Sequence, residues 1–142
     1  MRSIKKREKQ KASILYVEDE AITRMTVHKM LQARYTTIYQ AGDGREGLEL
    51  YKTHHPDVVI TDTRMPLMDG IHMSRAIREL NPDIPIIFIT ANEDADFVEE
   101  TKKLNVTCNI IKPIVLKDLF ATLENILGSP VPAERTGESQ PG

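Results

Sequence analysis

The sequence predicts an α/β domain built on one five-stranded parallel sheet, and two observations support that prediction. Short runs rich in β-branched residues recur along the chain, and stretches with apolar residues at helical spacing separate them. Strands that alternate with helices form parallel sheets that helices cover on both faces. Right-handed crossovers then bring the carboxyl ends of all strands to one edge of the sheet. The expected strands are Ile14–Val17, Thr37–Ala41, Val58–Thr61, Ile86–Thr90 and Cys108–Ile111.

A helical pattern fills each interval between strands, and a fifth pattern follows the last strand. This last pattern is the clearest, because its apolar residues from Leu116 to Leu127 fall on one helix face. Asn81-Pro82 and Gly128 each end a helix, since proline cannot continue a helix and glycine readily caps one. The other helices are expected around Thr23–Leu31, Gly44–Tyr51, Met73–Leu80 and Phe97–Leu104.

The apolar content of the strands predicts their order. The first, third and fourth strands are strongly apolar, which suits the centre of a covered sheet, whereas the second mixes polar residues and suits an edge. These preferences fit the doubly wound order 2-1-3-4-5. In that order a crevice lies between the first and third strands at their carboxyl ends, where ligands bind in such folds.

Length and composition indicate a single globular domain. The chain has 142 residues, of which 40% are hydrophobic and 28% charged. No stretch approaches the ~20 apolar residues of a membrane span, and no signal peptide is recognisable. The single cysteine, Cys108, fits a reducing compartment, so we expect a cytoplasmic protein with no membrane contact. The expected domain spans 13–128, between a disordered basic leader, 1–12, and a disordered tail or linker, 129–142, rich in Pro, Ser, Gly and Glu.

Charge is distributed unevenly along the chain. Residues 1–12 carry six basic side chains and one acidic side chain, a net charge of +5. The remainder carries 13 basic and 20 acidic side chains, a net charge of -7. An acidic body argues against direct nucleic-acid binding.

Polar side chains gather where the strands end. Glu18 and Asp19 follow the first strand, Asp62 follows the third, Thr90 ends the fourth and Lys112 follows the fifth. Three carboxylates in one crevice repel one another and imply a cation, and hard oxygen ligands at a water-accessible site favour Mg2+. With Mg2+, Lys112 and Thr90 to stabilise phosphoryl oxygens, Asp62 can act as the nucleophile in phosphoryl transfer.

From about Ser13 to Leu127, the sequence resembles the receiver domain of two-component response regulators, which has a flavodoxin-like fold. Each motif is short, but their joint occurrence, in order and at strand ends, is specific. The motifs are Val17-Glu18-Asp19-Glu20, Asp62-x-x-Met65-Pro66-x-Met68-Asp69-Gly70, Thr90-Ala91 and Lys112-Pro113.

The resemblance implies that Asp62 accepts a phosphoryl group from the phosphohistidine of a sensor histidine kinase or a histidine phosphotransfer domain. It implies Mg2+ bound by Glu18 or Asp19, by Asp62 and by the backbone carbonyl of Arg64. Thr90 would move toward the phosphoryl group and Lys112 would contact it, with a cis Lys112-Pro113 bond.

The resemblance also implies how the domain communicates. A downstream effector would bind the surface of the fourth helix, fifth strand and fifth helix. The protein would be a signalling phosphoacceptor and not an enzyme, apart from self-phosphorylation and autodephosphorylation. The family commonly has an aromatic residue three positions before the lysine, where this chain has Asn109. We therefore expect Thr90 to respond to phosphorylation but the effector surface to respond differently.

Three other interpretations remain. An aspartyl-phosphate phosphatase of the haloacid-dehalogenase type shares the Asp, Thr, Lys and Mg2+ chemistry, but its second acid would stand where this chain has Arg64, and no cap domain is present. A receiver-like interaction module without phosphorylation would not need Asp62 and Lys112. The G-x-G-x-x-G pattern Gly42–Gly47 resembles a dinucleotide fingerprint, but it follows the second strand and Asp43-Gly44 is a common turn pair.

Overall fold

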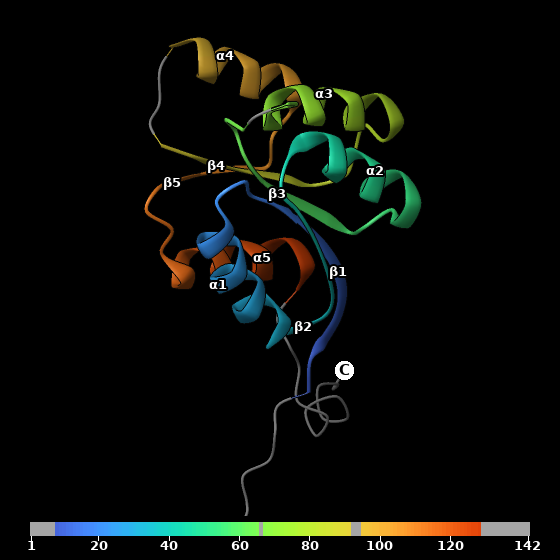
Figure 1. Cartoon of the computed structure of the whole chain (residues 1–142), viewed down its shortest axis with the longest axis vertical. Coiled ribbons are helices and arrows are strands. Elements are labelled where there is room, and N and C mark those ends of the chain that lie inside the picture. Colours follow the sequence, from blue (N-terminus) through green and yellow to red (C-terminus); the bar gives the residue numbers. More distant parts are fainter. Residues whose placement is uncertain (1–7, 66, 92–94, 129–142) are drawn as a thin grey trace, which may run out of the picture.

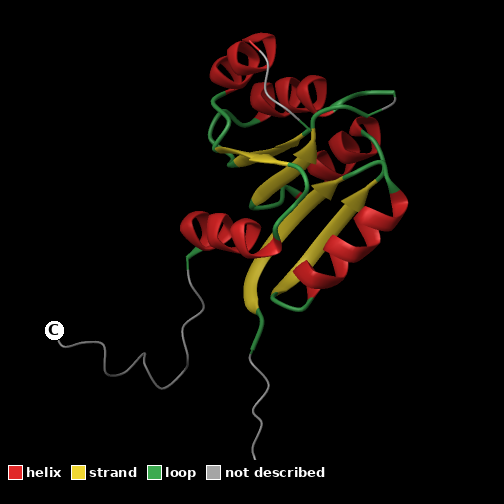
Figure 2. Cartoon of the chain, turned by 90° about the vertical axis from the view of Figure 1, so that its left-hand side faces the viewer, coloured by secondary structure: helices red, strands yellow, loops and turns green. Residues whose placement is uncertain are grey.

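The computed structural model describes residues 8–65, 67–91 and 95–128, which form five strands alternating with five helices. The strands make one parallel sheet in the predicted order β2-β1-β3-β4-β5, and Figure 2 shows them side by side with their arrowheads pointing the same way. The strands are β1 Gln10–Val17, β2 Tyr35–Ala41, β3 Val58–Asp62, β4 Ile86–Thr90 and β5 Cys108–Ile111. The helices are α1 Ala21–Gln32, α2 Gly44–His54, α3 Gly70–Leu80, α4 Ala95–Leu104 and α5 Leu116–Leu127.

Helices cover both faces of the sheet. Figure 1 shows α1 and α5 on one face and α2, α3 and α4 on the other. Every residue of β3 and β4 is buried, as expected for strands covered on both sides. Within the described residues, no helix is both long and apolar enough to span a bilayer.

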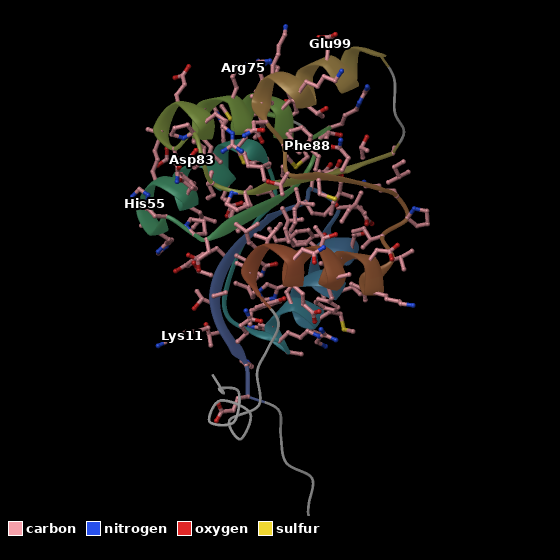
Figure 3. The ribbon with its side chains drawn as sticks, turned by 180° about the vertical axis from the view of Figure 1, so that it is seen from behind. Lys11, His55, Arg75, Asp83, Phe88 and Glu99 are labelled. Atoms are coloured by element: carbon pink, nitrogen blue, oxygen red, sulfur yellow. The ribbon has the colours of Figure 1, made fainter. Side chains whose placement is uncertain are left out.

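Alternation along the strands divides the apolar core into two clusters. Tyr16 and Ile60 point toward α1 and α5, where they pack with residues of both helices. Val59 and Phe88 belong to the cluster on the other face, and Figure 3 shows Phe88 between the sheet and the α3 and α4 layer. Because the faces alternate, residues two positions apart at a strand end emerge on the same side of the sheet.

The first strand begins earlier than expected. β1 starts at Gln10, three residues before the expected start of the domain, so the prediction of a disordered leader is wrong for residues 10–12. Ala12 is buried and its backbone exchanges two hydrogen bonds with Thr36 Oγ1, each 3.2 Å long. The Gln10 side chain donates to the carbonyls of Leu127 and Gly128, each at 2.9 Å. Residues 1–7 of the expected leader and the expected tail lie outside the described residues.

The glycine-rich segment after β2 starts α2. Asp43 caps this helix and accepts a hydrogen bond from the Glu46 N–H at 2.9 Å, while the Glu46 carboxylate accepts one from the Gly42 N–H at 2.9 Å. This pair resembles a capping box, with the Glu46 side chain accepting from the residue before the cap. A Cβ on Gly44 would lie 2.1 Å from the carbonyl oxygen of Met68, so only glycine permits this close approach. The G-x-G-x-x-G pattern is therefore explained by helix capping and by packing against the β3–α3 loop.

Candidate functional site

Asp62 lies at the carboxyl end of β3, and the following loop folds tightly back against it. The Gly70 N–H donates to the carbonyl oxygen of Thr63 at 3.0 Å. A Cβ on Gly70 would lie 2.0 Å from the carbonyl oxygen of Asp62, which excludes any larger residue there. Asp62 is only 4% exposed. The strand and the loop thus fix a carboxylate that the fold almost completely buries.

Register between β1 and β3 brings the other carboxylates to Asp62. Val17 pairs with Thr61 across the two strands, so the next residues, Glu18 and Asp62, face each other at the sheet edge. One carboxylate oxygen each from Glu18, Asp19 and Asp62 lie within 4.8 Å of one another. Glu18 is 1% exposed, whereas Asp19 is exposed to solvent. The predicted acidic cluster is therefore present between β1 and β3.

The carboxylate of Glu18 has one oxygen satisfied and one free. Oε2 accepts a hydrogen bond from the Glu20 N–H at 3.0 Å, while Oε1 is buried without a hydrogen-bond partner among the described residues. Burial raises the pKa of Glu18 to about 7, and the charge of Asp62 adds to this, although the Glu20 N–H and Lys112 act in the opposite direction. A buried carboxylate oxygen without a donor, beside two further carboxylates, fits a divalent cation with hard oxygen ligands.

Lys112, which follows β5, brings a positive charge to the acidic cluster. Its Nζ lies 2.7 Å from Asp62 Oδ2, and its backbone N–H donates to the Thr90 carbonyl at 2.8 Å. Burial lowers the pKa of Lys112, but the hydrogen bond and charge of Asp62 outweigh it, so the pKa is raised and the lysine stays protonated. The Arg64 N–H donates to Asp62 Oδ1 at 3.3 Å. The Lys112–Pro113 bond is cis, as the resemblance implied.

One cleft contains every residue predicted for the site. Its volume is about 300 Å³, and Thr90, 4% exposed, lies at the end of β4 in its wall. The cleft combines anionic ligands for a cation with a lysine and a hydroxyl that can bind phosphoryl oxygens. Its lining residues are Glu18, Asp19, Glu20, Thr23, Asp62, Thr63, Arg64, Thr90, Ala91 and Lys112.

Two residues near the cleft did not emerge from the sequence. Arg24 Nη1 donates to the Glu18 carbonyl at 2.7 Å and holds the backbone of the acidic pair. The Tyr16 side chain is fully buried on the same strand, and its hydroxyl has no hydrogen-bond partner in the described part of the chain. A polar aromatic residue two positions before Glu18, within the apolar run Ile14–Val17, was the available signal for Tyr16. Arg24 gave none, because a helical arginine is ordinarily solvated.

Strand β5 is part of the surface of α4, β5 and α5 that the resemblance implied for an effector. Asn109 pairs with Phe88 across β4 and β5 and is exposed, so no aromatic ring fills this position. Ile111 at the end of β5 is 48% exposed, and Val115, which precedes α5, is 50% exposed. Large apolar side chains with this exposure leave the surface available for contact with another protein.

Comparison with a family model gives a match to the response regulator receiver domain over residues 14–124. Among curated proteins, the transcriptional regulatory protein PdtaR of Mycobacterium tuberculosis is 37% identical over 112 residues, which cover 78% of this chain and 54% of that protein. The chain therefore spans about half the length of this relative.

Solved structures show the same fold. The N-terminal domain of an uncharacterized protein from Wolinella succinogenes superposes with a TM-score of 0.78 at 33% identity, covering 81% of this chain and 93% of that one. A CheX–CheY–BeF3–Mg2+ complex from Borrelia burgdorferi contains a chain that matches with a TM-score of 0.74 at 25% identity, covering 81% of this chain and 88% of that one.

Proposed function

Because the chain belongs to the response regulator receiver domain family of two-component signalling, we propose that Asp62 is its phosphoacceptor and Mg2+ its cofactor. The observation that carries this proposal is the environment of Asp62. The carboxylate is buried, its two oxygens bind the Lys112 ammonium and the Arg64 N–H, and two further carboxylates face it across the cleft. A lysine beside the acidic cluster suits an aspartate that must meet a dianionic phosphoryl group.

In the proposed transfer, a carboxylate oxygen of Asp62 attacks the phosphorus of a phosphohistidine. The new O–P bond forms as the N–P bond breaks, and the electron pair of the broken bond stays on the imidazole nitrogen of the donor. A Mg2+ ion held by the acidic residues would supply positive charge to offset the negative charge of the phosphoryl oxygens. Lys112 exchanges its hydrogen bond from Asp62 Oδ2 to a phosphoryl oxygen, and the Thr90 hydroxyl donates to another. No general base is needed, because an ionised carboxylate is already nucleophilic.

We assign the Mg2+ ligands from the oxygen atoms that the cleft offers. Glu18 or Asp19 and Asp62 supply carboxylate oxygens, and the Arg64 carbonyl supplies a neutral oxygen. The free Oε1 of Glu18 supports this assignment, because a buried anionic oxygen without a donor is costly unless a cation or water meets it. Arg64 occupies the position where a haloacid-dehalogenase phosphatase would need an acid, so a leaving-group acid is missing.

The phosphodonor is proposed to be a sensor histidine kinase or a histidine phosphotransfer domain. The cleft continues into an apolar groove of about 570 Å³ that shares Thr23, Ala91 and Lys112 with it. Ile22, 72% exposed, and Ile114 line this groove. A donor that delivers a phosphoryl group to Asp62 must cover the mouth of the cleft, so the groove lies within its footprint.

The output is proposed to pass through the surface of α4, β5 and α5 to an effector protein. Exposed Ile111 and Val115 support this choice. The effector is a protein partner and not a nucleic acid, since the body of the domain is acidic. A cytoplasmic location fits a receiver that a kinase must reach.

The proposal is tested by labelling with acetyl phosphate and Mg2+, followed by intact mass. Wild-type protein and Asp83→Asn, a matched change at an exposed aspartate, are expected to gain one phosphate, and Asp62→Asn none. Unlabelled wild type, where another receiver labels, refutes phosphoacceptance. Catalytic turnover of an added phosphate ester would instead indicate a phosphatase.

A further inference from the structure

Tyr16 lies in the core, two residues before Glu18 of the acidic cluster on the same strand. Tyr16 pairs in register with Ile60 across β1 and β3, and both belong to the apolar cluster facing α1 and α5. Glu18 and Asp62 follow them by two residues, so they lie on the same side of the sheet, one step closer to its carboxyl edge. The Tyr16–Ile60 pair is thus the layer of the core on which the Glu18–Asp62 pair rests.

A phenol group in this place needs a hydrogen-bond partner. Tyr16 is 0% exposed, and its hydroxyl is bonded to no atom of the described residues. Two residues along a strand advance about 6.6 Å, which is within reach of a tyrosine side chain that leans along the strand. Burial raises the pKa of Tyr16 first, and the charges of Glu18 and Asp62 raise it further, so the hydroxyl stays protonated.

Glu18 presents the complementary group. Its Oε1 is also buried and also has no partner within the described chain. The hydroxyl is a donor and the carboxylate oxygen an acceptor, yet they do not bond directly. Buried polar groups that the protein leaves unpaired are ordinarily joined by ordered water.

We infer that Tyr16 is a positioning residue for the cation site, whose O–H donates to a buried water that in turn donates to Glu18 Oε1. A carboxylate oxygen has two lone pairs, so the water leaves one for a cation. The water and the Glu20 N–H then hold the two oxygens of Glu18 from opposite sides, which fixes the orientation of the carboxylate before Mg2+ arrives. Partners of metal ligands commonly set affinity in this way. The inference rests on the proposed Mg2+ site.

The test compares Tyr16→Phe with Tyr35→Phe. Tyr35 is a buried tyrosine of the same apolar cluster, but it opens β2 at the opposite edge of the sheet. Each variant loses the phenol oxygen of a buried tyrosine, and only Tyr16→Phe removes the link to Glu18. Mg2+ affinity is measured by calorimetry on the unphosphorylated proteins, after circular dichroism shows that each is folded. We expect Tyr16→Phe to weaken Mg2+ binding about 10-fold and Tyr35→Phe to leave it unchanged.

Two outcomes separate this inference from the proposed function. Equal Mg2+ affinity of wild type and Tyr16→Phe overturns the role of Tyr16 alone, whereas a wild type that binds no Mg2+ overturns the proposed cofactor. A high-resolution crystal structure of wild type decides the matter if Tyr16→Phe does not fold. An ordered water bonded to both Tyr16 Oη and Glu18 Oε1 supports the inference, and a dry cavity or a direct protein partner overturns it.

Discussion

Glu18 allows the electrostatics of the cleft to be tested by a single isosteric change, Glu18→Gln. The carbonyl oxygen of glutamine can still accept the hydrogen bond that the Glu20 N–H donates at 3.0 Å. The change removes the charge, which lies buried within 4.8 Å of the carboxylates of Asp19 and Asp62, and puts an amide NH2 group in place of the unpaired Oε1. Because glutamine does not titrate, the pH-dependent part of the difference in stability between the two proteins reports the cost of that charge.

The sign and size of the effect follow from the pKa of Glu18. Burial raises it from 4.5 to about 7, so the folded protein holds a proton that the unfolded chain has already released between these two values. Stability must then fall as pH rises through this interval. At about 1.4 kcal/mol per pH unit, the full interval corresponds to about 3 kcal/mol, and water in the open cleft reduces this to about 2 kcal/mol.

Urea unfolding without divalent cations, followed from about pH 5 to pH 8, measures the difference. We expect Glu18→Gln to match wild type near pH 5 and to be about 2 kcal/mol more stable at pH 8. Mg2+ should stabilise wild type at pH 8 and stabilise Glu18→Gln much less. Glu49→Gln, a change at an exposed glutamate of α2, is the control and should follow wild type. Equal stability of wild type and Glu18→Gln across the whole pH range refutes the reasoning.

Three further changes test other parts of the domain. Lys112→Met removes the ammonium group 2.7 Å from Asp62, so Mg2+ should bind several-fold more tightly while phosphorylation by acetyl phosphate fails. An unchanged Mg2+ affinity in calorimetry contradicts this expectation. Arg64→Ala keeps the backbone carbonyl but removes a guanidinium near the phosphoryl group, so it should alter the phosphoryl half-life more than the Mg2+ affinity; an unchanged half-life counts against it. Arg78→Met loses hydrogen bonds that join α3 to the end of α4, including one of 2.7 Å to the Leu104 carbonyl. The change should lower the free energy of unfolding by about 2 kcal/mol and speed amide hydrogen exchange in α4 alone. Exchange in α4 as slow as in wild type opposes this expectation.

Much of the fold could be predicted from the sequence, because the apolar runs that mark the strands exist for the same reason that those strands are buried. β3 and β4 are covered on both faces, so their residues are almost continuously apolar, and that run marks both their position and their place at the centre of the sheet. The convergence of Glu18, Asp62 and Lys112 also followed, since parallel strands bring their carboxyl ends to one edge.

Other features depend on contacts that no local pattern encodes. The start of β1 at Gln10 rests on backbone pairing with β2, so it leaves no hydrophobic alternation to detect. The need for glycine at position 70 arises from the carbonyl of Asp62, which only the folded loop brings near. The unpaired hydroxyl of Tyr16 is visible only when its surroundings are known.

The hydrogen bonds from Gln10 to the carbonyls of Leu127 and Gly128 have a consequence for how the domain fits into a larger protein. They fasten the first strand to the end of α5, so the polypeptide enters and leaves the domain at one corner. Asp62 lies at the other end of the sheet, about 26 Å away over the eight residues of β1. Segments joined to either end of the domain would therefore begin at the same corner, far from Asp62 and its proposed phosphodonor. The domain could then be inserted between two neighbouring domains and still leave them close together.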